Sequence, residues 1–149
     1  MPAMMELSTH GAKLMLDGSE FRIKGANWRG AETHLNHVPL GLHRHPISYY
    51  GHFLKANGFN TVRLHFCHAS VLQGRRIEAV TADGEEHIDA ERSLLGLTYI
   101  EMLLSVATSL QHHGILVILV ASRLAPAPAV EPGLWYSDDV PLVMVKLSW

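Results

Sequence analysis

The stretch from Tyr99 to Ala121 reads YIEMLLSVATSLQHHGILVILVA and decides the fold class. Its first half spaces apolar residues three and four positions apart, which predicts an amphipathic helix that ends before Gly114. Thr98 and Glu101 have the spacing of a capping box at the start of that helix. Ile115 to Ala121 is a continuous apolar run rich in β-branched residues, typical of a strand covered on both faces. A helix followed at once by a covered strand indicates a parallel α/β sheet.

The preceding sequence supplies more elements of the same kind. Ile47 to Asn57 has helical spacing and is followed by Gly58, which favours a left-handed cap. Phe59 to Phe66, FNTVRLHF, is rich in β-forming residues and predicts a strand, and Ile23 to Asn27 predicts the first core strand. Strand, helix, strand, helix and strand in succession predict parallel strands joined by right-handed crossovers.

The remaining segments are predicted as a hairpin and loops. Lys13 to Ile23 holds two short apolar segments joined by Asp17-Gly18, a dipeptide that favours a tight hairpin turn. Residues 29–46, 67–96 and 122–133 are rich in turn-forming or polar residues and are predicted as loops. This order fits an open doubly wound sheet or the beginning of a (β/α)8 barrel, and periodicity alone does not choose between them.

Composition excludes several partners. The chain has twelve Lys and Arg residues and fourteen Asp and Glu residues, without long runs of one charge. Neither nucleic acid nor an anionic membrane surface is therefore an expected partner. The longest apolar run is far shorter than the roughly 20 residues of a membrane-spanning helix. Acidic Glu6 lies where a secretory signal would carry its apolar core, so no signal is predicted and no compartment is assigned. The single cysteine, Cys67, is predicted to be a small buried apolar residue.

Four strings of the sequence resemble glycoside hydrolase family 5, the cellulase family, in the order in which that family has them. They are IKGANWRGAET (Ile23 to Thr33), LKANGFNTVRL (Leu54 to Leu64), the helix-strand stretch from Tyr99 to Val120, and LWYSDDVP (Leu134 to Pro141). The resemblance implies a partial (β/α)8 TIM barrel, with about the first three β/α units after an N-terminal hairpin. Residues 1–149 are then a single truncated family domain, in which 13–23 form the hairpin and 23–149 hold barrel strands one to three.

The resemblance also implies a function. Family members are retaining hydrolases of O-glycosyl bonds in β-linked polysaccharides, of the cellulase or mannanase kind, and their expected partner is a polysaccharide or oligosaccharide without a cofactor. Their two catalytic Glu residues follow strands four and seven, which are not in this sequence. Because the reaction needs two carboxyl groups about 5 Å apart, we expect no hydrolysis by this chain alone. Two alternatives are a noncatalytic carbohydrate-binding or interaction remnant and a small doubly wound domain unrelated to sugars.

The resemblance carries over to a few site residues. Arg63 matches the strand-two arginine that keeps the nucleophile ionised, since a guanidinium group favours a neighbouring charged carboxylate. Asn27 and Trp28 match the end of strand one near the sugar-binding floor, and Trp135 and Tyr136 can stack on a pyranose ring. In the alternative interpretation, Arg63 pairs with another acid and the aromatic rings pack against the protein.

Some positions depart from the family pattern. Ser122 stands where the family has an active-site histidine after strand three, and a hydroxyl cannot carry the charge of an imidazole. His65 stands where the family commonly has proline. Glu131 is the only carboxylate on the loop after strand three, and we interpret it as a solvated loop residue.

Histidine pairs raise the question of a metal site. His43 and His45 fall in a predicted loop, and neither they nor the pair of His65 and His68 have an acidic ligand at a telling spacing. We therefore predict no metal. The neighbouring pair at positions 112 and 113 suits the negative end of a helix dipole.

Overall fold

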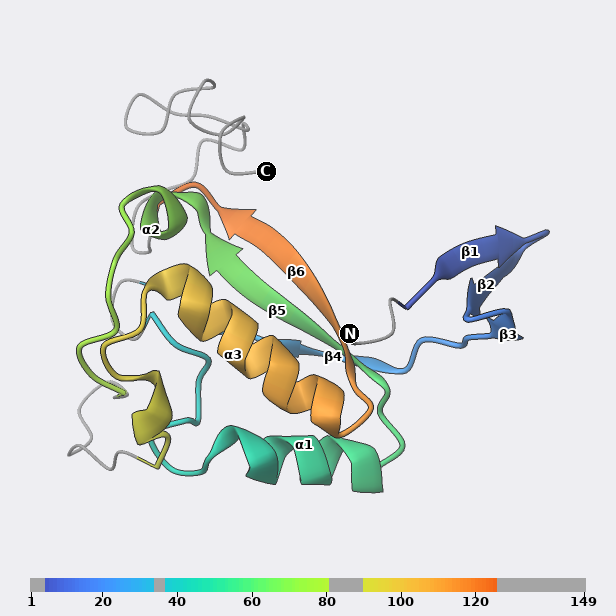
Figure 1. The fold of residues 1–149 in the computed structure, drawn as a ribbon, viewed down its shortest axis with the longest axis horizontal. Coiled ribbons are helices and arrows are strands. Elements are labelled where there is room, and N and C mark those ends of the chain that lie inside the picture. The colour runs from blue at the N-terminus through green and yellow to red at the C-terminus, as the bar shows by residue number, and fades with distance from the viewer. Residues whose placement is uncertain (1–4, 34–36, 81–89, 126–149) are drawn as a thin grey trace.

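The computed structural model describes residues 5–33, 37–80 and 90–125. Within these residues it has an antiparallel sheet of order β1-β2-β3 and a parallel sheet of order β4-β5-β6 (Figure 1). The strands are β1 (Leu7–His10), β2 (Lys13–Leu16), β3 (Ser19–Glu20), β4 (Gly25–Trp28), β5 (Thr61–Cys67) and β6 (Leu116–Arg123). The helices are α1 (Ile47–Ala56), α2 (His68–Leu72), the 3-10 turn η1 (Arg92–Leu94) and α3 (Tyr99–His112).

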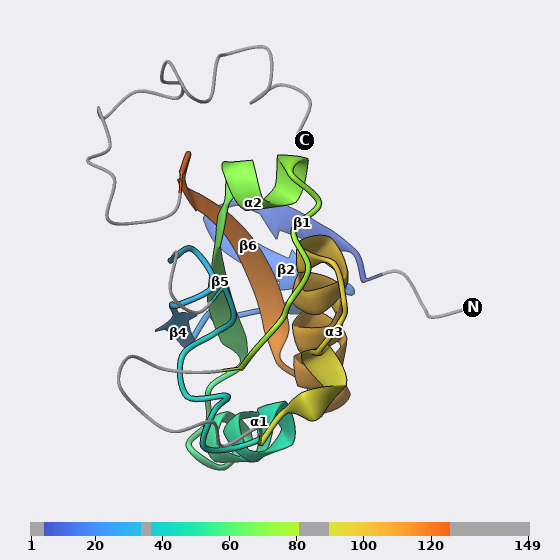
Figure 2. The same cartoon turned by 90° about the vertical axis from the view of Figure 1, so that its left-hand side faces the viewer.

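The parallel sheet confirms the predicted alternation of strands and helices. Helix α1 connects β4 to β5, α3 lies between β5 and β6 in the chain, and both helices lie beside the sheet (Figure 2). The register pairs Asn27 with Arg63, and Arg63 with Ile118. The first core strand begins at Gly25, two residues later than predicted, and Ile23 is exposed.

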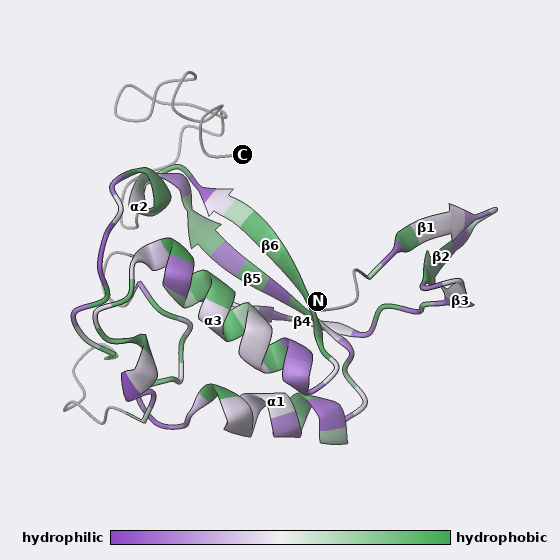
Figure 3. Cartoon of the chain, viewed as in Figure 1, coloured by the Kyte–Doolittle hydropathy of each residue, from purple (hydrophilic) through white to green (hydrophobic). Residues whose placement is uncertain are grey.

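The hydrophobic core lies between the parallel sheet and the helices. Alternation along β5 turns Val62, Leu64 and Phe66 into this core. They meet α3 side chains that are also buried, namely Tyr99, Met102, Leu103, Val106 and Leu110. Figure 3 shows the hydrophobic colour of β6 and the polar residues that interrupt β5. The same alternation turns Arg63 to the opposite face of the sheet, where it is exposed.

The start of α3 confirms the predicted capping box. Thr98 Oγ1 accepts a hydrogen bond from the Glu101 backbone N–H at 3.3 Å, and the Glu101 carboxylate accepts from the Thr98 backbone N–H at 2.7 Å. That backbone hydrogen bond is the main reason why the pKa of Glu101 lies below its usual value. The helix ends at His112, and Gly114 takes a positive φ of 71° just beyond it.

Tyr99 ties the loop after β4 to the end of β5. Its side chain is completely buried, and its hydroxyl donates to the Ala31 carbonyl at 2.7 Å. The same hydroxyl accepts a hydrogen bond from the Cys67 backbone N–H at 3.1 Å. Burial raises the pKa of Tyr99 well above its usual value, so the hydroxyl keeps its proton and can serve both partners.

Replacing Tyr99 by phenylalanine is therefore expected to lower the free energy of unfolding by about 1–3 kcal/mol, because the carbonyl of Ala31 and the N–H of Cys67 lose their partner inside the protein. Urea unfolding followed by circular dichroism measures the change. The matched control is Tyr49→Phe, since Tyr49 is 48% exposed. Equal stability of the two variants would contradict a stabilising role for the two hydrogen bonds of the Tyr99 hydroxyl.

The hairpin is confirmed at its turn and extended at its N-terminal side. Asp17 and Gly18 both have positive φ, 50° and 78°, as the predicted tight turn requires. The predicted second arm is shorter than expected, because only Ser19–Glu20 pair with β2. The sequence did not predict β1, whose LSTH has one large apolar residue and only exposed side chains; pairing with β2 makes it a strand.

The segment 67–96 was wrongly predicted to be an irregular loop. It contains α2 and η1, and within the described part it buries Ile77, Val80 and Leu94 in the main core. These apolar residues are too widely spaced to show a period. Strand β6 also runs two residues beyond the predicted end, through Ser122 and Arg123.

Candidate functional site

Polar side chains gather on the face of the parallel sheet that points away from the core. Asn27 on β4 pairs in register with Arg63 on β5, and Arg63 Nη1 donates to Asn27 Oδ1 at 3.2 Å. His65 follows two residues along β5 and places its Nε2 atom 3.5 Å from the same Asn27 oxygen. We call Asn27, Arg63 and His65 the polar cluster. Asn27 and Arg63 are exposed, so a ligand can reach them.

His65 is the buried member of the polar cluster, with 8% of its surface exposed. Burial is the main reason why the pKa of its imidazole lies below the usual 6.5, and the charge of Glu32 opposes this shift. The neutral imidazole is therefore the stable form at neutral pH. Its Nδ1 atom is buried and has no hydrogen-bond partner among the described residues.

Glu32 is a buried carboxylate on the loop after β4. Only 1% of its surface is exposed, and it accepts hydrogen bonds from Arg29 Nε at 2.9 Å and from the Gly30 backbone N–H at 2.7 Å. Burial alone would raise the pKa of Glu32, but these hydrogen bonds outweigh it and the pKa lies below its usual value. No sequence motif points to Glu32; its local signal is Arg29 three residues earlier.

The two shifts predict how stability depends on pH. Because the folded pKa values of His65 and Glu32 lie below their unfolded values of 6.5 and 4.5, both groups bind protons more readily when the chain unfolds. Their stabilisation is present above those unfolded values and is lost as the pH falls through the folded ones. The free energy of unfolding should therefore fall in two stages, first below about pH 6.5 and again below about pH 4.5.

Urea unfolding at a series of pH values measures this profile. The variant His65→Gln has no imidazole at that position, so its loss between pH 6.5 and 5 should be smaller than in the wild type. Superimposable profiles of the two proteins would contradict the assignment to His65.

The structure separates Trp28 from the polar cluster. Trp28 pairs with Leu64 in register and turns to the core side, where its ring lies 4.9 Å from the ring of Tyr50. Its Nε1 atom donates to the Leu40 carbonyl at 2.8 Å. These contacts agree with the alternative interpretation, in which the Trp28 ring packs against the protein. A role of Trp28 in sugar binding stays a prediction.

Other predicted positions lie on β6 or beyond it. Ser122 lies on β6, and its buried Oγ has no hydrogen-bond partner within the described ranges. Because His65 pairs with Val120, both departures from the family pattern lie on neighbouring strands. Trp135, Tyr136 and Glu131 lie outside the described residues.

Three further findings concern metal ligands, membrane-spanning helices and the single cysteine. In the described ranges, no three His, Cys, Asp or Glu side chains come together as metal ligands would. None of the helices found there is long and apolar enough to cross a membrane. Cys67 is fully buried, as predicted, and its Sγ lies 3.4 Å from the Leu124 carbonyl oxygen.

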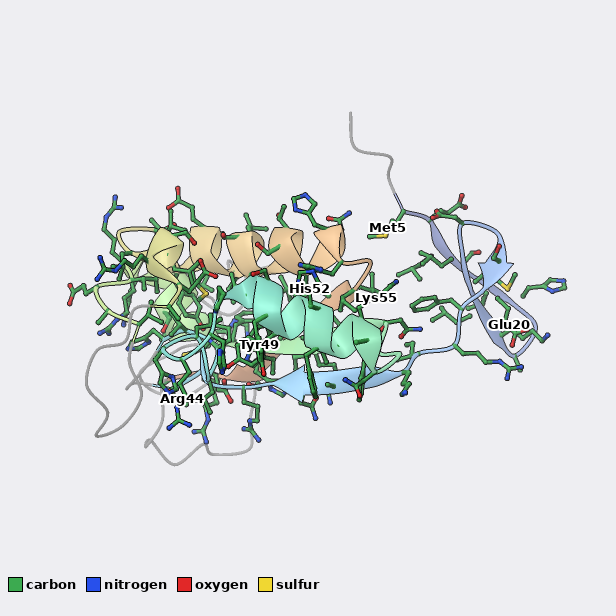
Figure 4. The ribbon with its side chains drawn as sticks, turned by 90° about the horizontal axis from the view of Figure 1, so that it is seen from below. Met5, Glu20, Arg44, Tyr49, His52 and Lys55 are labelled. Carbon is green, nitrogen blue, oxygen red and sulfur yellow. The ribbon has the colours of Figure 1, made fainter. Side chains whose placement is uncertain are left out.

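A separate hollow of about 560 Å³ lies beside α1. It is lined by Gly41, His43, Arg44, His45, Tyr49, Tyr50 and Phe53. The His45 ring stacks on Tyr49 at 4.0 Å, and the Tyr50 hydroxyl donates to the Gly41 carbonyl at 2.9 Å. Figure 4 shows Arg44 and Tyr49 near the start of α1, with His52 and Lys55 further along it. None of these described lining residues belongs to the polar cluster.

Comparison with known proteins finds similarity in structure alone. No protein-family model and no curated protein sequence matches the chain. A hyperthermophilic endocellulase from Pyrococcus horikoshii is 26% identical, with a TM-score of 0.80 over 97% of this chain and 38% of its own. A complex of the endocellulase from the same organism with cellotetraose is 26% identical, with a TM-score of 0.75 over 93% of this chain and 36% of its own.

An endoglucanase from a second organism is also similar in structure. The catalytic domain of the major endoglucanase from Xanthomonas campestris pv. campestris is 27% identical, with a TM-score of 0.64 over 85% of this chain and 34% of its own. The chain thus spans less than two fifths of each of these proteins. It is an α/β chain whose parallel sheet and helices are similar in structure to part of an endocellulase.

Proposed function

We propose that the chain is the N-terminal part of a glycoside hydrolase family 5 (β/α)8 barrel and that its polar cluster binds a β-linked oligosaccharide. The observation that carries this proposal is the TM-score of 0.80 to an endocellulase over 97% of the chain. The exposed pair of Asn27 and Arg63 lies on the sheet face away from the helices, which is the face that a barrel turns inward.

Uncovered apolar side chains support the barrel. Tyr49 and Phe53, one turn apart on α1, are 48% and 54% exposed. Ile100 and Leu104, one turn apart on α3, are 48% and 55% exposed. In a closed barrel each outer helix has a neighbour on both sides, so such pairs are expected where further helices pack.

Arg63 supplies the strongest hydrogen-bond donors of the polar cluster. Its guanidinium group carries five N–H donors in a fixed geometry, and the bond to Asn27 Oδ1 uses Nη1 alone. The remaining donors suit the hydroxyl oxygens of a sugar. Hydrogen bonds to charged groups contribute about 1.5–3 kcal/mol each, so this residue should dominate the affinity.

We further propose that the chain alone binds without hydrolysis. A retaining glycosidase needs a nucleophile and an acid about 5 Å apart. Glu32, the carboxylate whose charge acts on His65, is already held by Arg29 and Gly30. These contacts make Glu32 a poor nucleophile or acid. They therefore support the interpretation of the chain as a noncatalytic carbohydrate-binding remnant.

Isothermal calorimetry with cellotetraose tests the binding. We expect a saturable heat in the wild type and an affinity at least about 10-fold lower in Arg63→Ala, as loss of one charged hydrogen bond predicts. The matched control is Arg22→Ala in the hairpin, because Arg22 is exposed and bonded only to Glu20 among the side-chain contacts described. No heat in the wild type would overturn the binding proposal. Reducing-sugar release from β-glucan or β-mannan above background would overturn the inactive form.

A further inference from the structure

Asn27 has one side-chain oxygen that two neighbours share. Arg63 Nη1 donates to Asn27 Oδ1 at 3.2 Å, and His65 Nε2 lies 3.5 Å from it. A guanidinium group has no acceptor, so the atom that faces Arg63 must be the oxygen of the amide. The contact with Arg63 therefore identifies the Asn27 atom that faces β5 as Oδ1.

This arrangement favours the tautomer of His65 that carries its proton on Nε2. The atom that Nε2 approaches is an acceptor, and a neutral imidazole has one N–H donor and one bare nitrogen. Nδ1 is the bare nitrogen, and it is buried with no partner in the part of the chain that the structure describes. The side chain is 8% exposed, so its position is held by the surrounding protein.

These contacts leave the other end of the amide available. Asn27 is exposed, and the contacts of its side chain with described residues both go through Oδ1, which leaves Nδ2 available. With its oxygen turned toward β5, Asn27 presents two N–H donors on the face that Arg63 also occupies. The two exposed members of the polar cluster therefore both offer N–H donors, which suit a ligand whose hydroxyl oxygens accept.

We propose that His65 is a positioning residue: it holds the Asn27 amide so that Nδ2 donates to a hydroxyl oxygen of the bound oligosaccharide. This proposal rests on the proposed function of the polar cluster. It gives a role to His65, which stands out in the sequence only as a replacement of proline and as one of a histidine pair. The hydrogen bond from Arg63 holds the Asn27 oxygen from one side. His65 adds a second contact to the same oxygen, which prevents rotation of the amide.

Two substitutions at position 65 separate positioning from packing. In His65→Gln the amide nitrogen of glutamine can replace Nε2, and we expect a dissociation constant for cellotetraose within about 2-fold of the wild type. In His65→Leu the side chain still fills the buried site but cannot donate, and we expect affinity about 3- to 10-fold lower, the range of one neutral hydrogen bond. Asn27→Asp, which keeps an oxygen toward Arg63 but removes the donor, should weaken binding at least as much.

A purely structural role predicts a different result. It would lower the melting temperature of His65→Leu without changing its dissociation constant, and that outcome would overturn the proposal. His10→Leu in the exposed strand β1 is the matched control and should change neither quantity.

A measurement without ligand tests the contact between His65 and Asn27 independently of oligosaccharide binding. Nitrogen-15 NMR of the imidazole should show the proton of His65 on Nε2, and His65→Leu should shift the side-chain amide signals of Asn27. A proton on Nδ1, or unchanged Asn27 signals, would overturn the positioning role. Should the wild type fail to bind cellotetraose, the proposed function fails and the ligand part of this inference fails with it, whereas the NMR result still decides the contact.

Discussion

Replacing Leu64 by alanine is expected to lower the free energy of unfolding by about 2–5 kcal/mol. Leu64 is fully buried in β5, the central strand of the parallel sheet, and faces the core formed with the helices. The substitution removes its buried contacts and leaves a cavity that neighbouring strands on both sides prevent from collapsing. Urea unfolding followed by circular dichroism measures the loss.

Leu104→Ala is the matched control for this prediction. It removes the same atoms from α3, but Leu104 is 55% exposed, so the expected change is about 0.5 kcal/mol or less. If Leu64→Ala cost no more than Leu104→Ala, the core would not lie between β5 and the helices.

Replacing Gly30 by alanine is expected to lower stability by about 3 kcal/mol or more, because backbone strain and overpacking add up. Gly30 has φ +121°, a conformation that side chains disfavour. A Cβ atom there would lie 2.6 Å from the Leu40 backbone nitrogen and 2.8 Å from the Val38 carbonyl oxygen. Because both contacts are backbone atoms, the loop itself must move.

The control for Gly30→Ala separates strain from collision. Gly74 also has a positive φ, +58°, but a Cβ atom there would meet nothing within 4 Å. Gly74→Ala should therefore cost about 1 kcal/mol, and the difference between the two variants measures the close approach of the 38–40 backbone. Equal losses would show that the Gly30 loop can yield. Movement of this loop would also displace Glu32, so Gly30→Ala should change the low-pH part of the stability profile.

Local signals in the sequence predicted the elements that pack against one another. The capping residues Thr98 and Glu101 marked the start of α3, and Gly114 marked its end. The run from Ile115 to Ala121 correctly predicted the strand β6 but not its exposure. Ile118 and Leu119 are 37% and 47% exposed, because β6 lies at the edge of the parallel sheet among the described residues. Strand β1 was missed because its stability comes from pairing with β2 and not from its own pattern.

The site was only partly predictable, for a physical reason. Asn27 and Arg63 came from the family resemblance, and the parallel register that pairs them accounts for their contact. Glu32 is buried because the loop after β4 folds back on itself, with Gly30 and Arg29 bonding its carboxylate. No period or motif in the sequence encodes such a closure. His65 likewise gains its importance from a neighbour on another strand.

Titration of the nitrogen-15-labelled chain with cellotetraose tests the account most directly, since NMR reports binding and its location together. The account predicts saturable shifts of the Asn27 side-chain amide and of the Arg63 and His65 signals, with β1, β2 and β3 unchanged. Absence of saturable shifts at the polar cluster, or equal shifts throughout the hairpin, would contradict it.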